Sequence, residues 1–223
     1  MKLMFRKRQG RRVPLTRTSA YRDLLYAAAQ FTTSEGFLTD SELIEYSENS
    51  LIEAVATEVA QGLFDQINYY RSNRYFAHKK LGGDCGNIHL MALEFMKKAY
   101  PHVPANLTLG EVTLSGCTEF PFNRERFLEW QKKRPEIFAC HAWITIGTSH
   151  IIDATLGTYI TTRISDSNCF GGVLYGSLEK LSVIPMANEP HLPPEGVHAV
   201  SYSPIVLGRG ALLACAPAFR ESP

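Results

Sequence analysis

The sequence predicts an α+β fold in a single domain, and three observations lead to this prediction. Helix-forming patterns occupy the first hundred residues, and residues with high β propensity concentrate after Pro104. No internal repeat or low-complexity segment divides the 223-residue chain. Helices followed by a run of strands indicate an α+β fold, with N-terminal helices followed by an antiparallel sheet. The chain is 45% hydrophobic and 20% charged, a balance typical of a globular protein with one buried core.

Three helices are expected before the strands, at residues 21–31, 51–70 and 88–99. The second has the clearest pattern, because Ser50 and Glu53 have capping-box spacing at its start. Apolar residues recur along it at helical intervals: Leu51, Ala54, Val55, Val59, Leu63, Ile67 and Tyr70. A mixture of Leu, Met, Ala, Glu and Lys favours helix in the third segment.

The second half of the chain is rich in residues with high β propensity, and a polar, helix-favouring segment at residues 123–133 interrupts it. The expected strands cover residues 107–114, 138–146, 151–155, 159–164, 199–203 and 205–207. Glycine and proline are frequent in the last 50 residues, which favours loops around the last two strands. We therefore expect one domain at residues 21–223, with a helical part at 21–72, and with the third helix and the sheet at 73–223.

The net charge of +1 conceals a basic N-terminal segment. Residues 1–20 contain seven Lys and Arg residues and no acid, whereas the rest of the chain has 16 basic and 22 acidic residues. We expect residues 1–20 to form a basic, flexible arm. Because such an arm is as readily a solvated tail as a binding segment, it predicts no specific nucleic-acid partner.

The cysteines and the hydropathy pattern indicate the compartment. Five cysteines is an odd number and none forms a Cys-x-x-Cys pair, which disfavours a full disulfide framework and a zinc ribbon. No run of 18 apolar residues occurs, and the first 30 residues lack the apolar stretch of a secretory signal. We expect reduced thiols, no transmembrane segment, and a cytoplasmic location or delivery by a route other than the Sec pathway.

Cys85 is the most informative candidate for chemistry. It follows Gly82-Gly83 and Asp84, and it is expected to open the third helix. At a helix start, unpaired N–H groups and the positive end of the helix dipole favour a thiolate. The glycines allow a substrate or another chain segment to approach closely. Cys85 is therefore the candidate nucleophile.

His141 is the candidate base. Even-numbered residues of its strand are apolar, whereas the odd-numbered ones include His141 and Trp143, so His141 is expected to point away from the core. A three-residue loop that pairs Ile146 with His150 places Asp153 opposite Trp143, on the face of His141. A shift of one residue would bury Asp153 in the apolar core, which disfavours other registers.

The order cysteine, histidine, carboxylate indicates a papain-like thiol site. In it Cys85 is the nucleophile, His141 is the acid and base, and Asp153 orients the imidazole and stabilises its charged form. The other cysteines have no base at a readable spacing, and Cys140 is expected in the core: Cys117, Cys140, Cys169 and Cys215.

A metal site is the other chemistry open to these side chains. Cys85 and His89 are four residues apart on one helical face, and His141 and Asp153 would supply further ligands. Nothing else in the sequence supports such a site, since a histidine on a helix is more often a packed or surface residue. We expect neither a metal nor another cofactor.

Four local motifs resemble the transglutaminase-like superfamily of papain-like cysteine enzymes. These are Gly83-Asp84-Cys85 at a helix start, a strand from Leu107 to Val112, His141-Ala142-Trp143, and Ile152-Asp153-Ala154-Thr155, with Ala154 where the family has proline. The resemblance implies a papain-like core and acyl transfer through a thioester, from a glutamine side chain or a peptide-like amide. Transfer to water would give deamidation or proteolysis, and transfer to an amine would give cross-linking.

The surroundings of the triad are less defined. Where papain-type enzymes have the glutamine of the oxyanion hole this chain has Lys79, so Tyr75, His78 and Asn87 are the candidates beside the backbone N–H of Cys85. Asn87 is also a candidate residue of the substrate channel. Trp143 either forms a wall of that channel or packs under residues 123–133.

Other functions remain open at this point. The motifs also resemble NlpC-type peptidoglycan amidases, although the usual Ser-Gly after the cysteine is missing, and more distantly arylamine acetyltransferases. If the chain is not an enzyme, the alternative is a non-catalytic binding module on the same fold. The expected partner is a protein or peptide substrate. A small thiol enzyme with a basic arm would suit a bacterial or phage effector or toxin, for which an inhibitor or immunity protein is a candidate partner.

Overall fold

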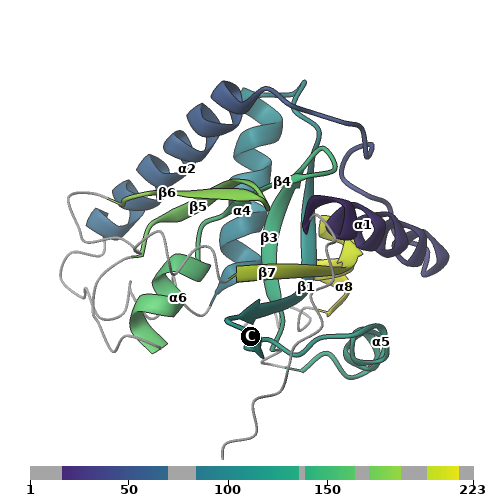
Figure 1. Cartoon of the computed structure of the whole chain (residues 1–223). Helices are drawn as coiled ribbons and strands as arrows, with labels where there is room; N and C mark the ends of the chain where they lie inside the picture. The colour runs from purple at the N-terminus through teal and green to yellow at the C-terminus, as the bar shows by residue number, and fades with distance from the viewer. Residues whose placement is uncertain (1–16, 70–83, 136–138, 164–170, 187–199, 216–223) are drawn as a thin grey trace, which may run out of the picture.

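The computed structural model shows helices packed around one antiparallel sheet (Figure 1). The structure describes residues 17–69, 84–135, 139–163, 171–186 and 200–215. Three helices precede the first strand: α1 (Arg17–Ser34), α2 (Asn49–Tyr69) and α4 (Cys85–Ala99). The predicted α+β order, helices first and then an antiparallel sheet, is confirmed.

In the described residues the sheet has seven strands, all paired antiparallel. They are β1 (Ala105–Leu114), β2 (Cys117–Thr118), β3 (His141–Ile146), β4 (His150–Asp153), β5 (Val173–Ser177), β6 (Lys180–Ile184) and β7 (Val200–Leu207). The order across the sheet is β2-β1-β3-β4-β5-β6, and β7 also pairs with β1. Consecutive antiparallel neighbours make β3, β4 and β5 a meander at its centre.

The hairpin of β3 and β4 has the register that the sequence predicts. Ile146 pairs with His150 and Ile144 pairs with Ile152, so the loop between them has three residues. Gly147 in this loop has a φ of 59°, a conformation that glycine adopts without strain. One more step along the register brings Asp153 opposite Trp143. The prediction that His141 and Asp153 share a face of the sheet therefore rests on a confirmed pairing.

Helices cover both faces of the sheet. On one face α2, α4 and α8 (Arg209–Cys215) bury an apolar cluster that includes the even-numbered residues of β3. The helix α5 (Arg124–Lys133) adds Phe127 to this cluster, and Asn123 caps its start, close to the predicted bounds 123–133. On the other face α1 and α6 (Leu156–Arg163) bury a second cluster around Trp143 and Tyr202. Figure 1 shows α4 behind the sheet and α1 beside β7.

This second cluster corrects one expectation. The odd-numbered face of β3 does not point away from the core, because Tyr21 of α1 and Tyr202 of β7 contact Trp143 on that face and every residue of β3 is buried. An alternation of apolar and polar residues predicts one solvated face. Here the polar groups of that face are buried with hydrogen-bond partners, as Thr145 is with Tyr21 of α1 and Thr108 of β1.

The segment predicted as a strand at 159–164 is a helix, and that prediction is wrong for its described part. Its β-branched residues favour strand, but the Asp153 carboxylate accepts the N–H groups of Thr155 and Leu156 and so caps the start of α6. Backbone contact between Gly157 and Gly171, where a side chain would not fit, holds this turn against the neighbouring loop. Residue 164 lies outside the described residues.

Other boundaries differ in detail. α1 already begins at Arg17, inside the segment expected to be flexible, and residues 1–16 lie outside the described residues, as do 70–83. α2 begins at Asn49, so Ser50 lies inside the first turn and does not cap it. The strands expected at 199–203 and 205–207 form the single strand β7, with a register shift opposite Gly110. The β5–β6 hairpin and α8 were not expected.

No helix among the described residues has the length and apolar character to span a bilayer.

Candidate active site

Cys85 is the first residue of α4, as the sequence predicts, and its side chain is half-buried. Asp84 occupies the N-cap position, but its side chain makes no capping bond to the helix. The sulfur lies 3.6 Å from the carbonyl oxygen of Cys140, the residue before His141. The nucleophile candidate therefore sits at the open, electropositive end of a helix, next to the start of β3.

His141 joins the other two members of the predicted triad. Its Nε2–H donates to Oδ2 of Asp153 across 2.6 Å, and both side chains are buried, at 2% and 0% exposure. Burial alone would lower the pKa of His141. The charge of Asp153, the hydrogen bond to it, and a hydrogen bond and charge from Cys85 together raise the pKa to about 10. The structure thus brings Cys85, His141 and Asp153 together, with His141 held as an imidazolium at neutral pH.

Asp153 is fixed by more than the histidine. Oδ1 accepts the backbone N–H groups of Thr155 and Leu156, each at 3.0 Å, and Oδ2 accepts the hydroxyl of Tyr202 at 2.8 Å. Burial alone would raise the pKa of Asp153, but the charge and hydrogen bond of His141 and these N–H groups hold it well below its usual value. Asp153 is therefore a carboxylate at neutral pH.

Tyr202 was missed by the sequence reasoning. It is a buried residue of β7, 49 positions from Asp153, and its phenol donates to the same carboxylate oxygen as His141. Burial and the neighbouring negative charge raise the pKa of Tyr202 well above its ordinary value, so the phenol remains a donor. No local signal marks it, because its contact with Asp153 exists only when β7 pairs with β1.

His89 contacts two parts of the site at once. Its Nδ1 lies 2.7 Å from the carbonyl oxygen of Cys85, and its Nε2 accepts the backbone N–H of Ala154 at 2.8 Å. Oδ1 of Asp153 is 3.5 Å from the same Nε2. Burial is the main cause that lowers the pKa of His89 to about 4, so the imidazole is neutral. The sequence marked His89 only as a candidate metal ligand.

Phe120 covers part of the His141 ring. The two rings stack with centroids 5.1 Å apart and planes 27° apart, and Phe120 also contacts Tyr159, with centroids 4.6 Å apart. The hydroxyl of Tyr159 donates to Glu119 at 3.0 Å. Phe120 is half-buried, so a substrate that reaches His141 from this side would meet an aromatic surface.

Trp143 packs in the second apolar cluster and not under residues 123–133. Its indole is fully buried, stacks beside His141, and donates through Nε1 to the hydroxyl of Tyr21 at 2.9 Å. Its packing partners are α1 and Tyr202, not residues 123–133. Gly110 of β1 permits this placement, because a Cβ there would lie 2.6 Å from the indole. This placement favours a core role for Trp143 over a channel wall.

Asn87 is exposed, and its amide nitrogen donates to the carboxylate of Asp84 at 2.6 Å. That bond turns the side chain toward the helix cap. The other two candidates for the oxyanion hole, Tyr75 and His78, lie outside the described residues, as does Lys79.

The remaining cysteines lie as follows. Cys140 and Cys215 are buried in the core, as expected for Cys140, and Cys117 is exposed. Cys169 lies outside the described residues. Within the described part of the chain, no group of three or more His, Cys, Asp or Glu side chains could hold a metal ion. Both nitrogens of His89 are instead bonded to backbone groups.

Comparison of the chain with protein-family models, with curated proteins and with solved structures finds no match.

Proposed function

We propose that this chain is a cysteine-dependent acyl-transfer enzyme with a transglutaminase-like, papain-like core, acting on a glutamine side chain or a peptide-like amide. One observation carries the proposal. A half-buried cysteine at a helix start lies against a buried histidine, whose far nitrogen donates to a fully buried carboxylate at 2.6 Å. A nucleophile, a base and a third group that orients the base are the components of thiol catalysis.

The geometry supports the following reaction. The Cys85 sulfur attacks the carbonyl carbon of the amide, and the protonated His141 gives its proton to the departing nitrogen, which leaves as ammonia or an amine. The acyl group is then held as a thioester. Water or an amine attacks this thioester, His141 takes the proton of the attacking group, and the sulfur leaves to restore the enzyme.

The chain's own groups assist each charge that develops. Asp153 stabilises the imidazolium through its 2.6 Å bond, and Tyr202 keeps the carboxylate in place. The backbone N–H of Cys85, at the uncapped start of α4, is the proposed donor to the oxyanion. No step requires a metal or another cofactor.

The test is incubation with a glutamine-containing protein and a fluorescent primary amine. Incorporation of the amine would identify cross-linking, and ammonia release without incorporation would identify deamidation. Cleavage of muropeptides alone would favour the NlpC-type amidase. Cys85→Ala should abolish the activity, whereas Cys117→Ala, at an exposed thiol in the β1–β2 hairpin, should retain it. A Cys85→Ala protein that keeps all its effects would leave the binding module as the better reading.

A further inference from the structure

His89 connects the two elements that carry the ends of the triad. It lies one turn into α4, four residues after Cys85, and its side chain is fully buried. One ring nitrogen is 2.7 Å from the Cys85 carbonyl, and the other is 2.8 Å from the N–H of Ala154, the residue after Asp153. A single side chain thus bonds to the backbone at the nucleophile and to the backbone at the carboxylate.

These two partners fix one protonation state of the ring. The Cys85 carbonyl can only accept, so Nδ1 carries the proton, and the Ala154 N–H can only donate, so Nε2 is bare. A second proton on Nε2 would face the Ala154 N–H. The ring of His89 also meets that of His141 edge-on, with centroids 6.2 Å apart. His89 is therefore a neutral bridge beside a charged histidine.

Loss of the His89 side chain would remove both of these hydrogen bonds. Ala154 is fully buried, so its N–H would lose its partner without access to water. The start of α4 would lose its direct hydrogen bond to the end of β4. The bonds of Asp153 to its other partners and the contact of Cys85 with Cys140 would remain, but no side chain would join the backbone at Cys85 to the backbone next to Asp153.

We propose that His89 is a positioning residue, which holds Cys85 and Asp153 at the spacing that the triad requires. The proposal rests on the proposed function for its catalytic meaning, but its structural consequence can be measured separately. His89 does not contact the reacting atoms. It acts through the backbone at Cys85, the nucleophile, and at Ala154, the neighbour of Asp153, which orients His141.

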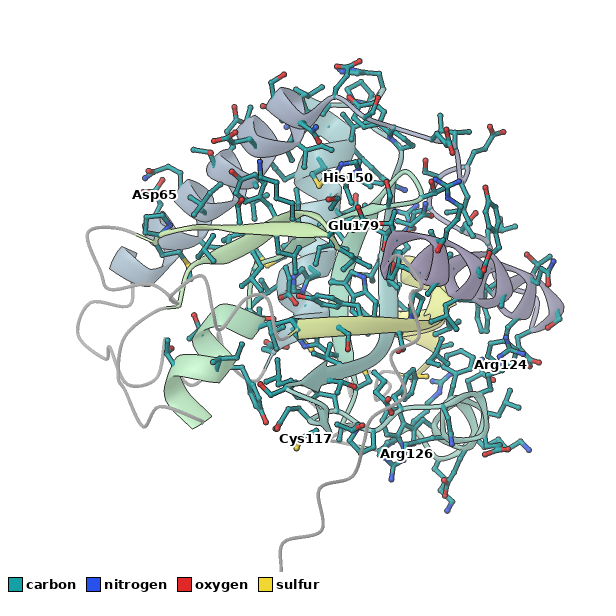
Figure 2. The ribbon with its side chains drawn as sticks, viewed as in Figure 1. Asp65, Cys117, Arg124, Arg126, His150 and Glu179 are labelled. Atoms are coloured by element: carbon teal, nitrogen blue, oxygen red, sulfur yellow. The ribbon has the colours of Figure 1, made fainter. Side chains whose placement is uncertain are left out.

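Three substitutions separate the two bonds. His89→Asn places a donor where Nδ1 lies and keeps the bond to Cys85, and His89→Gln places an acceptor where Nε2 lies and keeps the bond to Ala154. His89→Leu keeps neither. The control is His150→Gln, because His150 is another buried histidine, bonded to Asn49 at 3.0 Å at the far end of β4. Figure 2 shows His150 and the exposed Cys117 far apart in the molecule.

The first measurement is acylation of individual cysteines by p-nitrophenyl acetate, followed by peptide mass spectrometry. Acylation of Cys85 should fall about 100-fold in His89→Leu, the effect of a displacement of about 1 Å, and about tenfold in His89→Asn and His89→Gln. Acylation of Cys117 should not change, and His150→Gln should behave as the wild type at both thiols. Wild-type acylation of Cys85 in folded His89→Leu would overturn the proposal. Should His89→Leu fail to fold, wild-type rates in both of the other variants would overturn it.

The second measurement is the NMR resonance of the His141 proton that bonds to Asp153. We expect this downfield signal in the wild type and in His150→Gln, and a shift or loss in His89→Leu, or in His89→Asn if the leucine variant does not fold. An unchanged signal would overturn the positioning role. If wild-type Cys85 is acylated no faster than Cys117, the proposed function fails, and the NMR signal alone then decides whether His89 positions the pair.

Discussion

The bridge formed by His89 predicts an acid-sensitive contribution to stability. Its pKa is about 4 in the folded protein and about 6.5 in an unfolded chain, and the main cause of the difference is burial. The unfolded chain therefore binds a proton near pH 6.5, whereas the folded protein does not until the pH nears 4. The contribution is complete above pH 6.5 and is lost as the pH falls from 6.5 to 4.

The magnitude follows from the two pKa values. A difference of one pKa unit corresponds to about 1.4 kcal/mol, so the full effect is about 3 kcal/mol, of which about 2 kcal/mol is lost at pH 5. For a domain of this size that is a large part of a total stability of about 5–15 kcal/mol. His141 shifts in the opposite direction, so its contribution is present below pH 6.5 and is lost as the pH rises through about 10.

The assay is urea unfolding between pH 7.5 and 4.5, followed by the fluorescence of the two tryptophans, of which Trp143 is fully buried. The quantity to compare is the free energy of unfolding of the wild type minus that of His89→Gln at each pH. Asp153 and His141 are present in both proteins, so the part of their titration that does not depend on His89 cancels in this difference. The difference should fall by about 2 kcal/mol between pH 7.5 and pH 5. His102→Gln, at an exposed histidine, should follow the wild type.

A difference that stays constant with pH would refute the reasoning. It would mean that His89 takes up a proton in the folded protein as readily as in the unfolded chain, so that the bridge is not neutral. A difference that rises as the pH falls would mean that the imidazolium is the bonded form, contrary to the acceptor role assigned to Nε2.

Three further outcomes are expected. Cys85→Ala should lower any amide-directed activity at least about a thousandfold, with the stability within about 1 kcal/mol of the wild type in urea unfolding because the side chain is half-buried. Tyr202→Phe removes a charge-assisted bond to Asp153 and should cost about 1.5–3 kcal/mol by the same measurement, and an unchanged midpoint would exclude that bond. Gly110→Ala should destabilise the protein by about 2 kcal/mol or more, because a Cβ there would overlap a carbonyl of β7. Its control, Gly62→Ala, lies in open space on α2 and should stabilise by about 0.5–1 kcal/mol, so equal effects at both glycines would contradict this account.

The sequence alone determined the local part of the site. A helix start at Cys85 follows from short-range signals, namely the glycines before it and the helix-forming residues after it. The pairing of His141 with Asp153 follows from a three-residue loop and from the period of two in a strand, because only one register keeps the carboxylate out of the apolar face. Both signals act over a few residues, so they can be read without knowledge of the rest of the fold.

The tertiary structure decided which groups surround the triad. His89 is 65 residues from Ala154, and Tyr202 is 49 from Asp153, so neither contact has a local signature. The helix α6 forms against its β-branched composition because Asp153 caps it. Trp143 became a core residue because α1, more than a hundred residues away in sequence, covers the second face of the sheet. The periodicity of a helix or strand shows that its two sides differ in polarity, but only the packed fold determines which residues cover each side.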